Sequence, residues 1–238
     1  MTANLRKALN FMSLDNRKKK IFRTLVKEHI KTGIPVGSNF LVAKTGLELS
    51  SATVRNELAE LEEYGLLSQP HTSAGRVPSA AGFQFYVDNL MEVHALNNNA
   101  DKALRRIKKD YKVKNKELYK ALAKEIAGIS GETVIVAFGA SDIYYTGFTN
   151  LFSKPELQGY SFNVGNVIDK MNDVMHSAYH KINDDKLHIL LGNDNPFGTS
   201  CASIIAKVDN NLIVILGLLR MDYDENASVL NFIKELLN

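Results

Sequence analysis

Arg55 and Asn56 are the side chains in this sequence whose types and spacing most clearly suggest a chemistry. An arginine guanidinium can bond bidentately to guanine, and an asparagine amide to adenine, in the major groove of DNA. Both residues lie in the segment SSATVRNELAELEEYGLL, residues 50–67. The pair therefore predicts base reading, provided that a narrow element presents it to the groove.

The segment has the pattern of an amphipathic helix. Val54, Leu58 and Leu61 recur at i, i+4 and i+7, so they share one face that must be buried. Ser50 can cap the start of this helix, and Gly65 can take the left-handed conformation that ends it. The opposite face then carries Ala52, Arg55, Asn56 and Ala59.

Two further helices are predicted upstream. An apolar stripe in residues 14–33 indicates a first helix, which Gly33 and Pro35 stop. The next helix is expected to open with Ser38 as its N-cap and to close at Gly46. Three such helices make a helix-turn-helix unit. The stripe consists of Ile21, Phe22, Leu25, Val26 and Ile30.

A short hairpin is predicted after Gly65. The run LLSQ has the character of a strand, HTSAG has turn chemistry, and RVP is a return strand that Pro78 ends at an edge. A wing of this kind would follow the third helix directly. The residues expected on or beside its tip are His71, Thr72, Ser73 and Arg76.

The basic residues near the N-terminus support DNA binding only because they lie next to the predicted helices. An amphipathic helix with one arginine is, taken alone, more often a plain surface helix, and a charge run is more often a solvated face. Residues 1–31, however, contain nine Lys or Arg against two Asp or Glu, and Arg17, Lys18, Lys19 and Lys20 are consecutive. We expect this cluster to follow phosphates, because it adjoins the helix-turn-helix pattern.

The stretch from Leu14 to Leu90 resembles the N-terminal domain of the HrcA family of heat-inducible transcription repressors. The motifs that carry the resemblance are TGIPVGSNFLVAKTGLELSSATVRNELAELEEYGLL and QPHTSAGRVPSAAGFQFYVDNL. Near the C-terminus, YYTGFTNLFSKPEL, LGNDN and LRMDY resemble the blocks of that family's regulatory region in the same order.

The resemblance implies a repressor of heat-shock chaperone operons of the dnaK and groE type. Such a repressor binds double-stranded DNA, at the CIRCE inverted-repeat operator, as a homodimer, and the chaperonin GroEL modulates it. Carried over to this sequence, the recognition helix is Ser51 to Tyr64, with Thr53, Arg55 and Asn56 nearest the bases. The expected DNA-binding set is Ser38, Lys44, Ser51, Ala52, Thr53, Arg55, Asn56, His71, Thr72, Ser73 and Arg76.

The chain departs from the family pattern in the middle, where ETVIVAFG passes almost directly to YYTGF. Typical members carry roughly one more domain there. That stretch includes part of a GAF-like fold and most of an inserted dimerising domain, so dimer formation is the implied property most affected. Smaller departures are Ser51, where the family often has Pro, and Leu218 with Leu219, where it usually has Pro-Thr.

Composition indicates an ordinary globular protein. The chain has 238 residues, 45% hydrophobic content and a single Cys. We expect a cytoplasmic protein without membrane contact, since no segment reaches the length of a span and the N-terminal stretch is too polar for a secretory signal. The net charge is +3 for residues 1–99, +6 for 100–125 and −6 for 126–238.

The sequence predicts an α+β protein in three parts. Residues 1–92 form an N-terminal winged helix-turn-helix domain, and residues 93–128 form a basic linker and a helix marked by Leu118, Leu122 and Ile126. The basic residues of this segment are either a phosphate-contacting arm or part of an exposed linker helix, and we favour the linker helix. The two interpretations differ in whether the salt dependence of DNA binding changes when four of them are neutralised, namely Arg105, Arg106, Lys108 and Lys109.

Residues 129–238 are expected to form a reduced GAF-like α+β domain. Its strands are expected at TVIVAF, IYYTGF, LHILLG, CASIIAKV and LIVILGLL, with helices around VIDKMNDVMHSAYHKI and VLNFIKELL. The last two strands should form a hairpin that turns at Asp209, Asn210 and Asn211.

Enzyme chemistry is disfavoured by the pattern of reactive residues. Cys201 begins an apolar strand, where a free Cys is usually a small buried hydrophobe, and no GxSxG elbow or phosphate-binding Gly loop is present. His176 and His180 have metal-ligand spacing without an HExxH pattern, so two surface histidines are expected. His188 and Asp194 are further candidates of reactive type, and they do not change this interpretation. We predict no catalysis, metal or cofactor.

Asp222 or Asp224 is expected to cap the final helix, and Arg220 is expected to pair with a carboxylate. These are structural roles. One alternative function stays open for the whole chain, namely a winged-helix module that binds RNA or docks a protein without operator specificity. Preference for one DNA sequence would distinguish the two functions.

Overall fold

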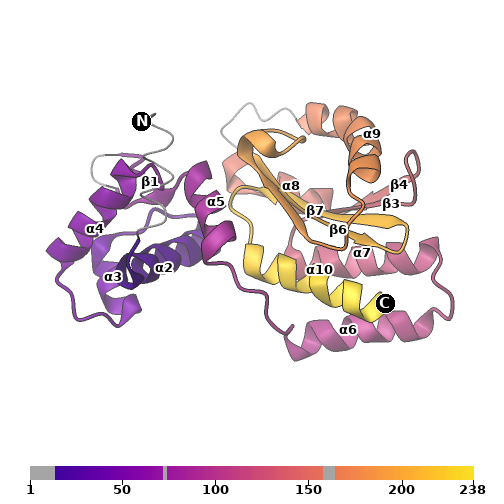
Figure 1. Cartoon of the computed structure of the whole chain (residues 1–238), viewed down its shortest axis with the longest axis horizontal. Coiled ribbons are helices and arrows are strands. Elements are labelled where there is room, and N and C mark those ends of the chain that lie inside the picture. The colour runs from indigo at the N-terminus through magenta and orange to yellow at the C-terminus, as the bar shows by residue number, and fades with distance from the viewer. Residues whose placement is uncertain (1–13, 72–73, 158–163) are drawn as a thin grey trace. The chain divides into compact units, whose positions relative to one another are not determined.

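A computed structural model of the chain describes residues 14–71, 74–157 and 164–238 (Figure 1). The chain divides into two compact units, Met1–Met91 and Glu92–Asn238. No helix among the described residues combines the length and apolar character needed to cross a bilayer.

The first helix of the first unit is α2 (Asn16–Thr32). The side chain of Asp15 accepts a hydrogen bond from the backbone N–H of Lys18 at its start, and Gly33 ends it in the left-handed conformation. Ile30 is only partly buried. The rest of the predicted apolar stripe is confirmed as buried, namely Ile21, Phe22, Leu25 and Val26.

Helix α3 (Ser38–Thr45) is the short second helix that the sequence predicts, and Gly46 ends it in the left-handed conformation. The expectation that Ser38 caps this helix is wrong. The N-cap is Gly37, and Ser38 is already helical. Its Oγ lies 2.9 Å from Oγ of Ser51, so the hydroxyl joins the starts of α3 and α4 instead.

Helix α4 (Ser51–Glu63) leads into a two-stranded antiparallel hairpin of β1 (Leu67–Ser68) and β2 (Val77–Pro78). Helix α5 (Ala80–Asn89) follows and is capped by the Ser79 side chain. The hairpin is as short as the turn-rich sequence predicts, because Pro78 cannot donate to a longer ladder.

The segment before Leu118 differs from the predicted linker. Residues Asn98–Asp110 form helix α6, which precedes α7 (Lys116–Ser130). Ala100 and Leu104 are buried, and α6 packs against α7 and α10 (Tyr223–Leu237) within the second unit. Only one narrow apolar stripe supports this helix, which explains why its many charges resembled a linker.

The basic side chains of α6 differ in their surroundings. Arg105 pairs with Asp101 at 2.5 Å and lies over the Phe232 ring at 5.0 Å. Arg106 stays 84% exposed. At least one member of the basic set therefore packs against the protein surface, as expected for an exposed structural helix.

A five-stranded sheet forms the centre of the second unit, in the order β4-β3-β7-β6-β5 with every neighbour antiparallel. Each of the five strands falls on a segment where the sequence predicts one, and β7 begins one residue earlier than predicted. Their bounds are β3 (Thr133–Ala137), β4 (Ile143–Thr146), β5 (His188–Leu191), β6 (Cys201–Val208) and β7 (Asn211–Leu218).

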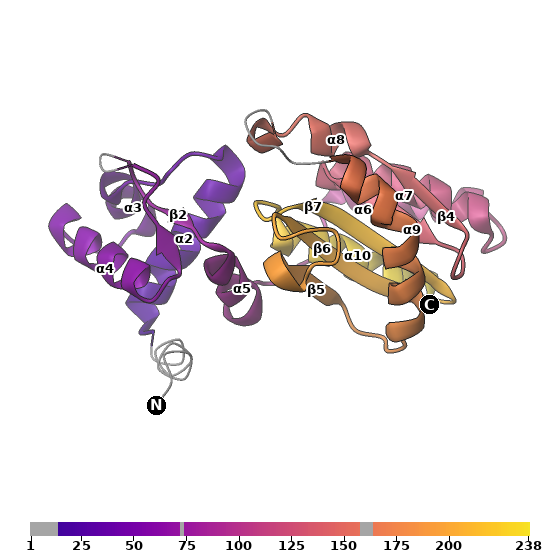
Figure 2. The ribbon, with the colours of Figure 1, turned by 90° about the horizontal axis from the view of Figure 1, so that it is seen from above.

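Helices cover both faces of this sheet (Figures 1 and 2). Helix α9 (Val164–Lys181) packs its Met171 and Met175 onto the face that contains Ile205 and Val214. Helices α7 and α10 lie against the other face. Burial on both sides explains why β6 and β7 are continuous apolar runs rather than alternating ones.

The connections confirm three local predictions. The β6–β7 hairpin turns at Asp209 and Asn210, with φ 51° at Asp209, while Asn211, predicted in the turn, is the first residue of β7. Asp222 caps α10 through the backbone N–H of Glu225, and Arg220 pairs with Glu156. The sequence did not predict the short helices between the strands, which are α8 (Phe148–Phe152) and the 3-10 turns η1 (Pro155–Leu157) and η2 (Gly192–Asp194).

Glu132 is a buried carboxyl just before β3, with 2% of its surface exposed. Oε1 lies 2.7 Å from Nζ of Lys154, while Oε2 has no hydrogen-bond partner among the described residues. Burial raises the pKa of this carboxyl to about 7 and outweighs the opposing effect of Lys154.

The raised pKa predicts a specific pH dependence. Between the ordinary value of 4.5 and about 7, the folded state holds this proton more tightly than the unfolded state. The stabilisation is therefore complete below about 4.5 and is lost as pH rises through about 7, on the order of 3 kcal/mol in total. Urea unfolding at several pH values should show that Glu132→Gln removes this component; a constant difference from the parent chain would contradict it.

Candidate nucleic-acid interface

Helix α4 presents its polar face as the sequence predicts. The Ser50 hydroxyl accepts a hydrogen bond from the backbone N–H of Thr53 at 3.0 Å, which fixes where the helix begins. The predicted inner face is buried, with exposed fractions of 0% for Val54, 3% for Leu58 and 0% for Leu61. The residues predicted to point outward are all exposed, namely Ala52, Arg55, Asn56 and Ala59.

Arg55 and Asn56 are free to bind. Among the described residues, neither side chain forms a hydrogen bond or an ion pair. The small side chains of Ala52 and Ala59 flank them on the same face, so little bulk stands between the helix and a flat partner. Side chains with unused donors on such a face can bond to base edges in a groove.

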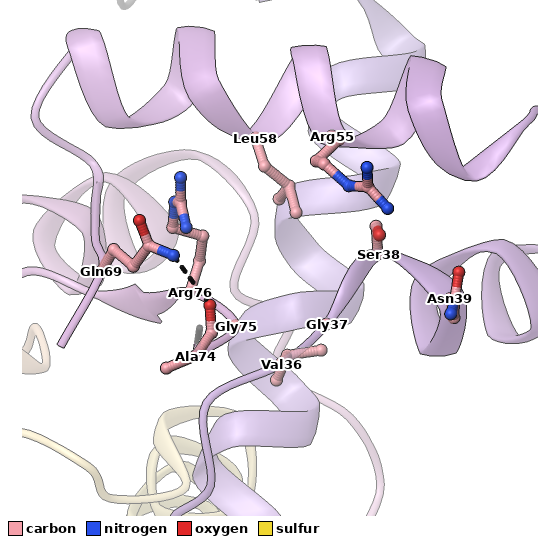
Figure 3. Close-up of a pocket in the computed structure, with 10 residues that line it drawn as sticks. All are labelled: Val36, Gly37, Ser38, Asn39, Arg55, Leu58, Gln69, Ala74, Gly75 and Arg76. Atoms are coloured by element: carbon pink, nitrogen blue, oxygen red, sulfur yellow. Dashed lines mark hydrogen bonds between the residues drawn. The ribbon is translucent and has the colours of Figure 1, made fainter. Parts of the chain in front are cut away.

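A cavity of about 350 Å³ lies beside this face (Figure 3). It is formed by the start of α3, by Arg55 and Leu58 of α4, and by the hairpin segment 74–76 with Gln69. The Arg55 guanidinium extends toward Ser38, and Gln69 Nε2 donates to the Ala74 carbonyl at 3.0 Å. Two helices and the hairpin thus meet around one exposed guanidinium.

The hairpin is attached to the segment before α3. The N–H of Val36 donates to the carbonyl of Arg76, and the N–H of Arg76 donates to the carbonyl of Val36, each at 2.9 Å. Gly75 permits this approach, because a Cβ there would lie 2.4 Å from the Val36 carbonyl carbon and oxygen. The glycine is thus required by backbone contact, which its position in a turn-rich segment did not reveal.

Arg76 is positioned differently from a residue on a wing tip. Its Nε lies 2.9 Å from a Glu62 carboxylate oxygen, and 17% of the side chain is exposed. The ion pair ties the return strand to α4. Any contact between Arg76 and an external phosphate would compete with Glu62.

Other predicted residues of this site lie in three places of the described chain. Ser38 and Ser51 share the hydroxyl contact between α3 and α4. Lys44 is exposed in the last turn of α3, and His71 is exposed in the hairpin loop. Thr72 and Ser73 lie outside the described residues.

The basic run 17–20 is divided between two roles. Lys18 Nζ lies 3.0 Å from Glu57 and 3.1 Å from Glu60, and Arg17 lies 2.5 Å from Glu57. The hydrogen bond that Lys18 donates to the Glu57 carboxylate raises the pKa of Lys18 to about 12. Two of the four cations therefore hold α2 against α4, which corrects the expectation that the whole run follows phosphates.

Glu57 is the residue that sequence reasoning missed at this site. Its side chain is only 6% exposed although it belongs to a charged stretch. A signal was present, because Glu57 follows Val54 and precedes Leu61 on the buried side of the helix. A buried carboxylate needs cationic partners, and the basic run of α2 provides them.

The residues considered for enzyme chemistry lie in different surroundings. Cys201 is fully buried, and burial raises the pKa of its thiol to about 11. His188 pairs with Asp184 at 2.6 Å, while the exposed His176 and His180 rings lie 4.8 Å apart on α9. The described residues contain no group of three His, Cys, Asp or Glu arranged to hold a metal ion.

Comparison with known families identifies the chain. Residues 86–226, more than half of its length, match the family model described as HrcA protein C terminal domain. The chain belongs to the HrcA family. The family resemblance predicted from the sequence motifs is thereby confirmed.

Two curated HrcA relatives illustrate how far the similarity extends. The protein named "Heat-inducible transcription repressor HrcA" from Carboxydothermus hydrogenoformans is 41% identical over 123 residues, which are 52% of this chain and 36% of the relative. The protein of the same name from Desulforudis audaxviator is 57% identical over 81 residues, 34% of this chain and 24% of the relative. The aligned part thus spans about a third or less of these HrcA proteins.

A solved structure shares the fold over nearly the whole chain. It is described as the crystal structure of a hypothetical protein at 2.2 Å resolution, and it superposes with a TM-score of 0.69. It covers 94% of this chain and 99% of the other at 15% identity. The arrangement of elements is therefore one that an experimentally determined protein also adopts.

The Gly75 contact predicts a position where a methyl group is not tolerated. Gly75→Ala should destabilise the protein by about 1–3 kcal/mol, because the Val36 backbone must move. Gly128→Ala is the matched control: its Cβ meets nothing within 4 Å, and the change gains helix propensity of up to about 1 kcal/mol. Thermal melting should separate the two variants, and equal melting temperatures would refute the contact.

The Glu57 network predicts a second loss of stability. Glu57→Gln keeps the size of the side chain but leaves Lys18 without its charged partner, so we expect a cost of about 1–3 kcal/mol. The exposed Glu63→Gln should stay within about 0.5 kcal/mol of the parent chain. Urea denaturation followed by circular dichroism measures both, and amide exchange in α2 and α4 should accelerate only for Glu57→Gln. Unchanged exchange would show that the network does not hold these helices together.

Proposed function

We propose that this chain is a sequence-specific DNA-binding repressor of heat-shock chaperone operons of the dnaK and groE type. In this proposal it recognises the CIRCE inverted repeat as a homodimer, and GroEL modulates its active fraction. The names of the HrcA relatives support the repressor class. The observation that carries the DNA-binding part is the pair of unengaged side chains on α4, Arg55 and Asn56, beside a hairpin.

The proposal treats residues 1–92 as a winged helix-turn-helix domain. Helices α2, α3 and α4 and the β1–β2 hairpin follow one another in the order that such a domain requires. Helix α4 is then the recognition helix, because its solvent face has small side chains around one Arg and one Asn. The hairpin is the wing, and its loop around His71 would lie along a backbone or groove beside the helix.

The second unit, with α6 and α7 as part of it, is proposed to be the reduced GAF-like regulatory domain. Its sheet with helices on both faces supports a compact α+β module. Two copies of the chain would place two recognition helices in successive major grooves of an inverted repeat, about one helical turn apart. Occupancy of that site by the pair would block transcription.

The GroEL part of the proposal is a mass-action effect. A chaperonin that favours the folded repressor raises its active fraction, and client overload during heat withdraws that support. No residue of this chain is assigned to the GroEL contact. The prediction is that added GroEL increases the DNA-binding fraction without changing which operator is preferred.

The first test is a titration on three duplexes at fixed, near-physiological salt, which are an intact CIRCE-type repeat, a single half-site and a scrambled sequence. The mass of the complex is measured in the same buffer. Tight binding to the intact repeat as a dimer, with clear loss on the other two, is the expected result. Equal binding to all three, unchanged by GroEL, would contradict operator recognition and favour an RNA-binding or protein-docking module.

The second test concerns base reading by α4. Asn56→Ala should lower affinity for the intact repeat by about 1–3 kcal/mol and leave binding to scrambled DNA nearly unchanged, because base contacts carry specificity. Asn172→Ala, an exposed residue of α9, is the matched control and should change neither affinity. Fluorescence anisotropy on the same duplexes measures all of these affinities. Equal weakening of both kinds of binding by Asn56→Ala would show that Asn56 does not read a base.

A further inference from the structure

A second cavity, of about 490 Å³, lies in the second unit between α9, β5 and the segment that follows β5. None of its lining residues belongs to the candidate nucleic-acid interface. Its volume is within the range of about 300–1,000 Å³ that small-molecule sites occupy. Nothing in the proposed DNA contacts requires such a space in this unit.

The wall of this cavity is apolar. Ile182, Phe197 and Ile205 are buried and belong to the core beneath α9. Val174, Ala178 and Leu190 are only partly buried and also line the cavity. An apolar ligand body placed here would remove their remaining hydrophobic surface from water.

One end of the cavity lies where α9 ends and β5 begins. Lys207 Nζ donates to the Ile182 carbonyl at 3.2 Å, and His188 lies opposite Ile205 in the sheet, so these segments meet at the same end. Lys181, the last residue of α9, also lines the cavity there.

The nitrogen-bearing side chains at this end differ in whether they already have a polar partner. His188 pairs with Asp184 at 2.6 Å, and Lys207 also donates to Asn183 at 3.0 Å. Lys181 is exposed and has no ion pair among the described residues. Lys181 therefore places a positive charge without an ion-pair partner in the described chain at the edge of the apolar cavity.

The opposite end of the cavity has more negative than positive side chains. Lys170, Asp173 and Asp194 line it, so the two carboxylates outnumber the one cation. Lys170 and Lys181 are eleven residues apart on one helix, a separation of about 16 Å along its axis. The two ends of the cavity thus differ in the sign of their charge: Lys181 makes one end positive, and the two carboxylates make the other end negative.

We propose that this cavity binds a small organic anion with an apolar body, held by its acidic head group at Lys181. The apolar part lies along Val174, Ala178 and Leu190, and the acidic end points away from Asp173 and Asp194. An apolar wall with a small number of placed polar or charged groups is the usual composition of small-molecule sites. The site is independent of the proposed DNA binding, so either can fail without the other.

Three probes of equal chain length test the chemistry, which are octanoate, 1-octanol and octylammonium. Isothermal titration of the full chain should show the tightest binding for octanoate. Amide shifts in an NMR titration should concentrate on α9 and β5. Absence of octanoate binding at millimolar concentration would overturn the site. Equal binding of 1-octanol would overturn the assigned head group, and equal binding of octylammonium would assign the charge recognition to Asp173 and Asp194.

Two variants locate the binding. Lys181→Glu should weaken octanoate binding about three- to tenfold and strengthen octylammonium binding, because it reverses the charge at the proposed head-group position. Lys124→Glu makes the same charge change at an exposed position of α7 and should alter neither affinity. If both variants weaken octanoate equally, a general charge effect replaces the proposed contact.

A filling variant tests the apolar wall. Ala178→Trp should abolish octanoate binding by occupying the space beside Leu190. Circular dichroism checks that the variant is folded, and if it is not, the Lys181→Glu comparison decides alone. Undiminished binding by a folded Ala178→Trp chain would place the ligand elsewhere and overturn the proposal.

Discussion

The first unit depends on one buried carboxylate. Glu57 lies on the inner side of α4, where a negative charge without partners would be strongly unfavourable. Arg17 and Lys18 of α2 supply the compensating charge at 2.5 and 3.0 Å. Because these contacts fix α2 against α4, they also fix how α4 turns its opposite face, with Arg55 and Asn56, toward solvent.

The hairpin is also held by contacts with other elements. The paired hydrogen bonds between Val36 and Arg76 and the ion pair between Arg76 and Glu62 join the hairpin to α3 and α4. Three segments distant in sequence thereby border one cavity next to Arg55. A basic residue that resembles a phosphate ligand in the sequence can thus serve as an internal attachment.

The second unit depends on covering both faces of its sheet. A sheet with two apolar faces must be covered on both sides, and α9 covers one while α7 and α10 cover the other. Coverage by α9 is incomplete beside β5, where partly buried apolar side chains line the second cavity. Helix α6 adds a further layer outside α7 and α10, so the basic segment 98–110 belongs to the packing of this unit.

The sequence by itself determined the elements whose signals are local. The spacing of Val54, Leu58 and Leu61, the Ser50 cap and the five apolar runs each identify a helix or strand, because periodicity and capping act within a few residues. Only the tertiary structure decided the roles of Glu57, Arg76 and Gly75, and that of Ser38 at the start of α3. Each depends on a partner from another element, and residue type alone does not show whether a charge meets water, an ion or a neighbouring helix.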